Sequence, residues 1–265
     1  MPERIPARFP AAVPRPFKVE LLAALPMEVR PFLRRRKLRP LKGLGVRARE
    51  FVLKEGRGVV VLTGMGWGMA HQAAVRLLAR CRPQMVLSLG FGGALTPQLS
   101  PGAIVLGTTS WHFYPDRGWL KEVPAPSPPR PLPEMLQHLA DRGLSASAAN
   151  FVTTPYIIHK GRQGAPLLSL TNPVVDLENS AVAEVAAAHG LPFVGLRVIV
   201  DAAGEEIPAF VAEAWEQGGK LGARHALTWL AADPRRAKDL LHWRRRSRAA
   251  AQQLAQALEL LLPWL

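Results

Sequence analysis

Short apolar runs alternate with segments of helical periodicity along this chain. The apolar runs are rich in β-branched residues and predict strands at residues 17–25, 48–54, 58–63, 85–89, 103–108, 150–154, 173–178 and 192–201. Between them, apolar residues spaced three or four apart predict helices at residues 26–36, 69–80, 132–142 and 180–189. Strands that alternate with helices form a largely parallel sheet covered on both faces. We therefore expect a single α/β domain with a twisted mixed sheet flanked by helices.

Three segments lack this alternation. Residues 1–16 contain several prolines and no periodicity, which predicts an irregular arm before a domain at residues 17–265. Residues 115–133 are also rich in proline, and we expect a long surface loop without regular structure there. The C-terminal segment 207–262 has helical periodicity, and its helices are predicted at residues 207–217, 221–230 and 233–262.

The last of these predicted helices is amphipathic. Its apolar stripe consists of Leu240, Leu241, Ala250, Leu254, Leu258 and Leu261. The opposite face carries an arginine cluster at residues 244–248. An amphipathic helix usually buries such a stripe against its own core, so packing on the sheet is the simpler interpretation, and peripheral contact with a membrane is the alternative.

The composition restricts the chemistry. Of the 265 residues, 48% are hydrophobic and 20% are charged, which is enough apolar surface for a substantial core. The chain has one cysteine, Cys81, and its seven histidines have no metal-ligand spacing, so we expect no disulfide, no metal and no bound cofactor. No uncharged run reaches the roughly 18 residues that span a bilayer. We expect a soluble protein of the reducing cytoplasm.

The net charge of +14 and the pI of about 11.1 require a positive surface potential. Basic residues cluster at residues 34–39 and 244–248, but neither run is interleaved with the aromatic residues that stack on single-stranded nucleic acid. A solvated face, or attraction to phosphorylated or anionic-lipid partners, explains these runs better. Nucleic acid is not the partner we expect.

Polar residues and glycines fall at the ends of several predicted strands. These features are Glu28, the glycine turn at residues 90–93, Asp176 with Glu178, and Arg197 with Asp201. Open α/β sheets bind their ligands at the carboxyl ends of their strands. An acid at the end of an apolar strand is costly unless it is paired or used. The coincidence of these features predicts one ligand site.

Each feature has an ordinary structural explanation when it stands alone. Glu28 fits an acid in the first turn of a helix, where the helix dipole stabilises it. Glu178 and Asp201 fit helix or turn caps. The glycines at residues 64–68 do not have the spacing of a dinucleotide-binding loop, and no acid follows about 20 residues later. Taken together, and in this order along the chain, these features favour one functional site over separate structural roles.

Five motifs in that order resemble the nucleoside phosphorylase and nucleosidase superfamily. They are residues 24–29 (ALPMEV), 64–66 (GMG), 88–95 (SLGFGGAL, with Pro101-Gly102 downstream), 175–181 (VDLENSA) and 197–201 (RVIVD). Within the superfamily the chain is similar to the methylthioadenosine/S-adenosylhomocysteine nucleosidases and to the hopanoid-associated enzymes. The resemblance implies a phosphorylase/hydrolase-like fold, a homodimer and an enzyme that cleaves the N-glycosidic bond of a purine nucleoside.

The resemblance also implies roles for individual residues. Glu178 would accept hydrogen bonds from the ribose hydroxyls, and Leu177 would pack on the sugar. Asp201 would bind and protonate the departing purine at N7. Glu28 would position the attacking water, with help from Arg197. Such a reaction passes through an oxocarbenium-like state, which needs an acid for the leaving base and a carboxylate for the water.

The remaining residues of the expected site surround these groups. They are Asp176, the sugar-side loop Gly90, Phe91, Gly92 and Gly93, and Tyr156 and Ile157, which would flank the purine. Two positions depart from the family pattern. Val200 stands where the family often has a serine beside the acid, so the hydrogen bond that orients Asp201 must come from elsewhere or be absent. Phe91 occupies a position that can carry a serine near the nucleophile.

Three functions are compatible with the sequence. The main interpretation is hydrolysis of an adenosine-type nucleoside, because the arginine set with which phosphorylases hold phosphate is not found. The first alternative is a phosphorolytic enzyme, with phosphate as co-substrate, that acts on a lipid-linked nucleoside such as adenosylhopane. The second is a non-catalytic nucleoside- or nucleic-acid-binding protein on the same fold.

Overall fold

The structure is a computed structural model that describes residues 17–207, 212 and 236–265. The irregular arm predicted at residues 1–16 lies outside the described residues. The helices predicted at residues 207–217 and 221–230 lie almost entirely outside them. Of the third predicted C-terminal helix, the part from residue 236 onward is described.

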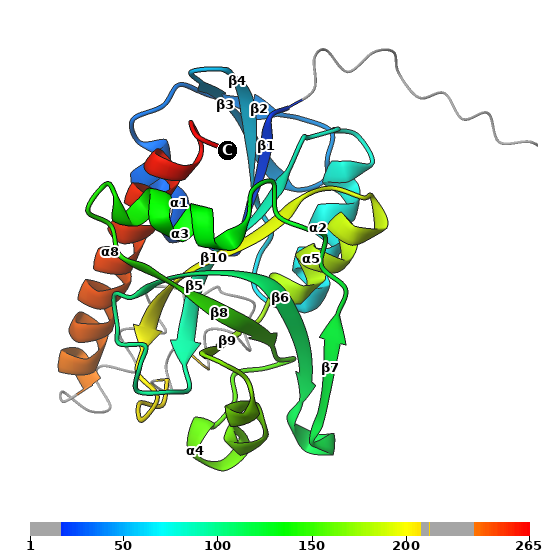
Figure 1. Ribbon diagram of the computed structural model, residues 1–265. Helices are drawn as coiled ribbons and strands as arrows, with labels where there is room; N and C mark the ends of the chain where they lie inside the picture. Colours follow the sequence, from blue (N-terminus) through cyan, green and yellow to red (C-terminus); the bar gives the residue numbers. More distant parts are fainter. Residues whose placement is uncertain (1–16, 208–211, 213–235) are drawn as a thin grey trace, which may run out of the picture.

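The described chain alternates strands and helices, largely as predicted (Figure 1). The strands are β1 (Val19–Ala23), β2 (Leu38–Leu41), β3 (Arg47–Leu53), β4 (Gly56–Leu62), β5 (Val86–Ala94), β6 (Ile104–Tyr114), β7 (Trp119–Val123), β8 (Ala146–Thr153), β9 (Pro173–Asp176) and β10 (Phe193–Asp201). The helices are α1 (Pro26–Leu33), α2 (Trp67–Leu78), α3 (Leu132–Ala140), α4 (Lys160–Gln163), α5 (Asn179–Ala188) and α8 (Arg236–Leu261).

The strands form one mixed sheet in the order β10-β6-β8-β9-β5-β1-β4-β3-β2, with β7 paired to β6. Because β10 pairs with β5 as well as with β6, the strands β10, β6, β8, β9 and β5 close into a ring. Strands β1 to β4 extend the sheet from β5. Strands β1, β4, β5 and β10 run parallel to one another. Their carboxyl ends therefore meet at one edge, which is where open α/β sheets bind ligands.

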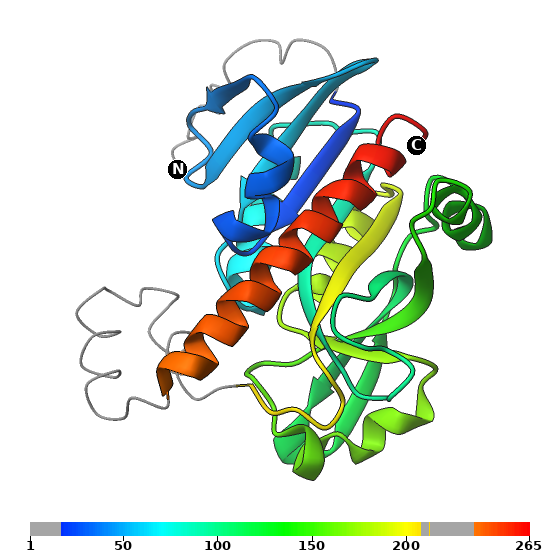
Figure 2. The same cartoon turned by 90° about the vertical axis from the view of Figure 1, so that its left-hand side faces the viewer.

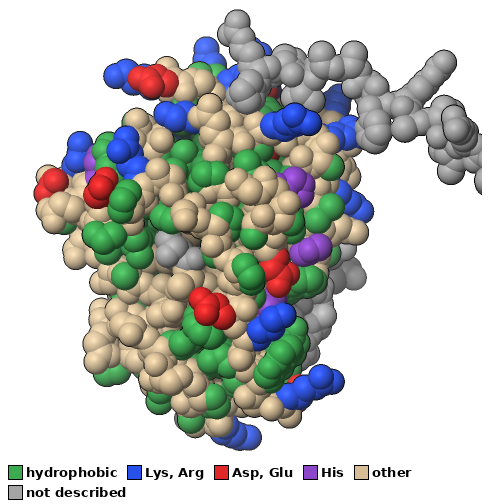
Figure 3. Space-filling model, turned by 45° about the vertical axis from the view of Figure 1, so that its right-hand side comes forward, with side chains coloured by type: hydrophobic (Ala, Val, Ile, Leu, Met, Phe, Trp, Pro, Cys, Tyr) green, Lys and Arg blue, Asp and Glu red, His purple; other side chains and the backbone are tan. Residues whose placement is uncertain are grey.

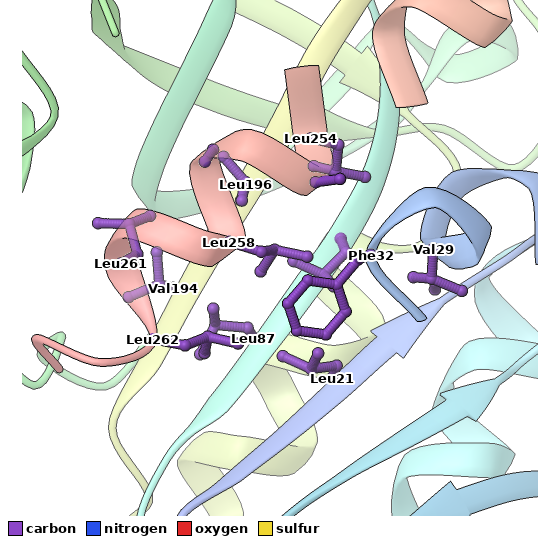
Figure 4. Packing of buried hydrophobic residues seen from close by; sticks show 14 of the residues in the cluster. Leu21, Val29, Phe32, Leu87, Val194, Leu196, Leu254, Leu258, Leu261 and Leu262 are labelled. Atoms are coloured by element: carbon purple, nitrogen blue, oxygen red, sulfur yellow. The ribbon is translucent and has the colours of Figure 1, made fainter. Parts of the chain in front are cut away.

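Helices cover both faces of the sheet. Helices α1, α3 and α8 lie on one face, and α8 runs beside α1 across the strands (Figure 2). The core there joins Phe32 of α1 and Leu258 of α8 to Leu21, Leu87 and Leu196 of the strands (Figure 4). Helices α2 and α5 contact each other and cover the other face through a second apolar cluster. The predicted packing of α8 on the sheet is thus confirmed for Ala250, Leu254, Leu258 and Leu261, whereas Leu241 is 54% exposed.

Two predictions of irregular structure were wrong. Residues 90–93 form no turn, because β5 continues through all four of them, paired with β10 along this stretch and with β9 at its end. Residues 115–133 contain β7, which forms a hairpin with β6 and follows Gly118, a residue with φ of 58°. Pairing with neighbouring strands overrides the low strand propensity of glycine in β5, and β7 contains no proline because the prolines of its segment lie on either side of it. Strand β2, which carries Pro40 at the sheet edge, was not predicted.

The surface is charged but not uniformly basic. On the face shown in Figure 3, lysine and arginine side chains lie mostly around the edge, and no continuous basic patch covers the centre. None of the described helices is long and apolar enough to cross a membrane.

Candidate active site

A pocket of about 160 Å³ lies at the carboxyl edge of the parallel strands, and most of its wall is apolar. Its lining includes Leu25 and Glu28 after β1, Phe91, Gly92 and Gly93 on β5, Ile157 and Lys160 around the start of α4, Asp176 at the end of β9, Leu177 and Glu178 directly after it, Asp201 at the end of β10, and Trp243 and Ser247 on α8. Nine of the twelve predicted site residues therefore line one pocket. The other three, Gly90, Tyr156 and Arg197, are not part of its lining.

Glu28 is held by the backbone at the start of α1. The N–H of Leu25 donates to its Oε2 at 2.7 Å, and the N–H of Phe91 donates to its Oε1 at 3.2 Å. The side chain is buried, and burial raises the pKa of Glu28 to about 7 against the lowering effect of these bonds and of Arg197. Gly90 is required beside it, because a Cβ there would lie 2.8 Å from Oε1. Glu28 is thus a fixed carboxyl that titrates near neutral pH.

Glu178 is the N-cap residue of α5, although its side chain makes no capping hydrogen bond, and β9 ends two residues before it. The N–H of Gly66, in the glycine turn before α2, donates to Glu178 Oε1 at 2.7 Å. Burial and the neighbouring Asp176 carboxylate raise the pKa of Glu178 to about 8. Hydroxyl donors that bind the carboxylate would lower this pKa again, because they favour the charged form.

Asp176 and Arg197 form a buried ion pair behind the pocket. Arg197 Nη2 lies 2.8 Å from Asp176 Oδ2, and the guanidinium also donates to the Ser88 carbonyl and hydroxyl at 2.8 and 2.9 Å. Thr153 Oγ1 donates to Asp176 Oδ1 at 2.6 Å. Arg197 is 1% exposed, so it acts on the pocket through its charge, which lowers the pKa of Glu28. Its sequence position indicated its importance but not this partner.

Asp201 ends β10 and is buried at the pocket wall. Burial raises its pKa to about 6, although the ammonium of Lys160 lowers it. Lys160 Nζ forms an ion pair with Asp201 Oδ2 and donates to the Ala202 carbonyl at 2.7 Å. Asp201 Oδ1 has no hydrogen-bond partner within the described residues. One oxygen of the acid is therefore held by Lys160, and the other is buried at the pocket wall without a hydrogen-bond partner.

Tyr156 lies apart from the lining. Its hydroxyl donates to Asp116 Oδ1 at 2.7 Å, so it ties the loop before α4 to the turn that joins β6 and β7. Ile157, its neighbour, does line the pocket, together with Ile158. The two predicted flanking residues are thus divided between the wall and the surface.

Sequence reasoning missed Lys160, Trp243 and Ser247. Lys160 stands in a segment without periodicity, and its carboxylate partner is 41 residues away, so no local pattern reveals it. Trp243 lines the pocket with Ser247, four residues later on the same face of α8. The spacing of four residues, which places both side chains on one face of a helix, was the sequence signal that could have identified this pair.

The three carboxyls Glu28, Glu178 and Asp201 share a largely apolar pocket, and each has a pKa between about 6 and 8. Carboxyls in this range accept or donate protons near neutral pH. Within the described residues, no group of His, Cys, Asp and Glu has the arrangement of a metal site. The arrangement suits acid–base chemistry on a small apolar ligand with hydroxyl groups.

Comparisons with known proteins agree with this fold. The crystal structure of 5′-methylthioadenosine/S-adenosylhomocysteine nucleosidase from Neisseria meningitidis, in complex with methylthio-immucillin-A, has a TM-score of 0.71 to this chain at 19% identity. The match covers 93% of this chain and 99% of that one. The expected phosphorylase-type α/β fold is confirmed.

Sequence relatives carry the same name. A 5′-methylthioadenosine/S-adenosylhomocysteine nucleosidase from a Marinomonas species is 29% identical over 171 residues, which cover 58% of this chain and 72% of that protein. The protein of that name from Tolumonas auensis is 26% identical over 225 residues, with 77% and 94% covered. The model of the Phosphorylase superfamily matches residues 13–230. The chain is therefore an enzyme, and it belongs to the phosphorylase superfamily.

Proposed function

We propose that this enzyme hydrolyses the N-glycosidic bond of an adenosine-type purine nucleoside. The observation that carries the proposal is the convergence of Glu28, Glu178 and Asp201 on one pocket, each with a pKa raised toward or beyond neutral pH. The names of the relatives, which are nucleosidases for methylthioadenosine and S-adenosylhomocysteine, support the adenosine type.

In this proposal Asp201 is the general acid. Its pKa of about 6 leaves a protonated fraction near neutral pH, and its free Oδ1 can give that proton to N7 of the purine. Protonation at N7 lets the ring accept the electrons of the bond that breaks. Ile157 and the other apolar wall residues would pack against the base and keep water from the acid.

Glu28 and Glu178 would act on the sugar side. Glu28, with a pKa of about 7, can accept the proton of the attacking water, and its position is fixed by the N–H groups of Leu25 and Phe91. Glu178 would ionise as the ribose hydroxyls bind and would then accept their hydrogen bonds. Leu177 would pack on the sugar ring, and Arg197 would favour the ionised form of Glu28.

The charge of the pocket favours water over phosphate as the nucleophile. Among the described lining residues, Lys160 is the one basic side chain, and it already pairs with Asp201. A phosphate ion would meet four carboxyl side chains and no arginine among these lining residues, whereas phosphate sites generally provide arginine or lysine donors. Hydrolysis is therefore the better-supported reaction, and phosphorolysis of a lipid-linked nucleoside is the alternative.

The test is release of free base by the purified protein. Methylthioadenosine, S-adenosylhomocysteine, adenosine, inosine and adenosylhopane are incubated with and without phosphate, and the base is measured by chromatography. We expect base from an adenosine-type substrate without phosphate. Strict dependence on phosphate would replace hydrolysis with phosphorolysis. No base from any of the five would leave the non-catalytic binding function.

A further inference from the structure

Lys160 and Asp201 form an ion pair that is almost fully removed from solvent. The two side chains are 3% and 1% exposed, so neither charge is hydrated in the ordinary way. Taking two charges out of water is costly, and an apolar pair of similar volume is often at least as stable. The pair is therefore poorly explained by stability alone. Its position on the wall of the pocket indicates a role in the chemistry.

The surroundings fix the lysine through both its side chain and its backbone. Its ammonium donates to the Ala202 carbonyl at 2.7 Å, directly after the acid. The backbone N–H groups of Lys160 and Gly161 donate to the Glu206 carboxylate at 3.3 and 3.2 Å, which ties the start of α4 to the end of β10. These contacts hold Nζ at the acid in one geometry, as a reacting site requires.

Gly93 on β5 leaves the space that the pair occupies. A Cβ on this residue would lie 2.6 Å from Asp201 Oδ2 and 3.2 Å from Lys160 Cε. The oxygen that meets the lysine is thus the one packed against β5, and Oδ1 is the oxygen without a partner. Val200, the residue directly before Asp201, has no hydroxyl that could orient the carboxyl.

We propose that Lys160 is a positioning residue for Asp201: it holds Oδ2 of the acid, directs Oδ1 at the base, and meets the negative charge left when Asp201 gives up its proton. This inference rests on the proposed function and adds a residue to it. In the step, the proton on Oδ1 moves to N7, and the electron pair of the C1′–N9 bond stays with the purine. Water adds to C1′ and gives a proton to Glu28. Asp201 is left as a carboxylate against an ammonium that is already in place.

Other charges near the acid are paired with one another. Glu205 raises and Arg246 lowers the pKa of Asp201, and the two form a bidentate ion pair at 2.6 and 3.0 Å. Glu28 and Glu178 also line the pocket, and burial raises their pKa values to about 7 and 8, so both lose most of their charge only below neutral pH. Lys160 is therefore the group whose removal most changes the charge at Asp201.

The experiment compares the wild-type protein with Lys160→Met, Lys160→Arg and the matched surface control Lys54→Met. Two substrates are used: the purine nucleoside that the wild type cleaves, and 4-nitrophenyl β-D-ribofuranoside, whose leaving group needs no proton. For Lys160→Met we expect a loss of at least about 10-fold in kcat on the purine nucleoside, in line with the size of general acid effects. We expect little loss on the nitrophenyl riboside.

The pH profile gives an independent readout. Without the ammonium the carboxylate form of Asp201 is less favoured, so the alkaline limb of kcat should move to higher pH in Lys160→Met. Lys160→Arg should keep the wild-type limb, since it keeps the charge, and it also serves as the test if Lys160→Met fails to fold. Lys54→Met should match the wild type on both substrates.

Two results overturn the inference. One is equal loss on both substrates with an unmoved alkaline limb, which is what a merely structural lysine gives. The other is wild-type kinetics in a folded Lys160→Met. A wild type that releases no base from any nucleoside instead overturns the proposed function itself, so the two failures are distinguishable.

Discussion

Glu20 is a buried carboxyl for which the proposed mechanism has no use. It lies on β1, is 0% exposed, and neither of its oxygens has a hydrogen-bond partner within the described residues. Successive side chains of a strand point to opposite faces of the sheet, so Glu20 lies on the same face as Leu22. This face is covered by α2 and α5, and Cys81 lies near Glu20 there. Burial raises its pKa from 4.5 to about 8. We predict that Glu20→Gln stabilises the protein, and more so as the pH rises.

The magnitude follows from proton linkage. The unfolded chain releases the Glu20 proton above pH 4.5, whereas the folded protein keeps it until about pH 8. Between these values the folded state binds more protons, so stability falls by about 1.4 kcal/mol for each pH unit. Raising the pH from 5 to 8 should therefore cost the wild type on the order of 3 to 4 kcal/mol through this group. Glutamine has nearly the same shape but does not titrate, so Glu20→Gln has no such pH-dependent loss of stability.

The measurement is urea unfolding of wild type and Glu20→Gln at pH 5 and pH 8. At pH 5 the two free energies of unfolding should differ by no more than about 1 kcal/mol, and at pH 8 Glu20→Gln should be more stable by about 3 to 4 kcal/mol. Glu55→Gln, at an exposed position, should follow the wild type at both pH values. A difference between Glu20→Gln and wild type that is the same at both pH values would refute the reasoning.

Three further predictions concern the site. The pH profile of kcat/KM should be bell-shaped with its maximum between about pH 6 and 7, because Asp201 must keep a proton and Glu28 must lose one. Glu28→Gln should remove the acidic limb of this profile. A flat profile in the wild type would contradict these roles. Gly93→Ala should lower kcat by at least about 10-fold because its Cβ displaces the acid, whereas Gly68→Ala, which meets nothing within 4 Å, should not; equal rates would contradict the close packing. Arg197→Met should lower the free energy of unfolding by about 3 to 5 kcal/mol, measured in urea, since it leaves the Asp176 carboxylate buried and unpaired; an unchanged midpoint would contradict the ion pair's importance.

Much of the site could be predicted because its residues follow strands that the sequence marks clearly. The β-branched run at residues 192–201 predicts β10, and Asp201 is its last residue. The same reasoning places Glu28 after β1 and Asp176 at the end of β9. Strands β1 and β10 both run parallel to β5 and share one carboxyl edge, so Glu28 and Asp201 converge once the sheet forms. Strand β9 runs antiparallel to β5, so Asp176 reaches the same edge from the opposite direction.

The parts that could not be predicted depend on contacts between distant segments. Lys160 reaches Asp201 across 41 residues, and an isolated lysine has no pattern of its own. The glycines at residues 90–93 predicted a turn because glycine disfavours strands, but strands on either side supply the hydrogen bonds that keep β5 extended. Placing Trp243 in the pocket requires knowing that α8 passes over it, and the amphipathic pattern of one helix does not show this.

The most direct test of the proposed chemistry is the rate of adenine release from methylthioadenosine by wild type and Asp201→Asn, without phosphate, between about pH 6 and 7. We predict that the wild type releases adenine and that a folded Asp201→Asn is slower by about 10²- to 10⁴-fold, the usual contribution of a general acid. Adenine release by Asp201→Asn at the wild-type rate would contradict the assignment of Asp201 as the acid.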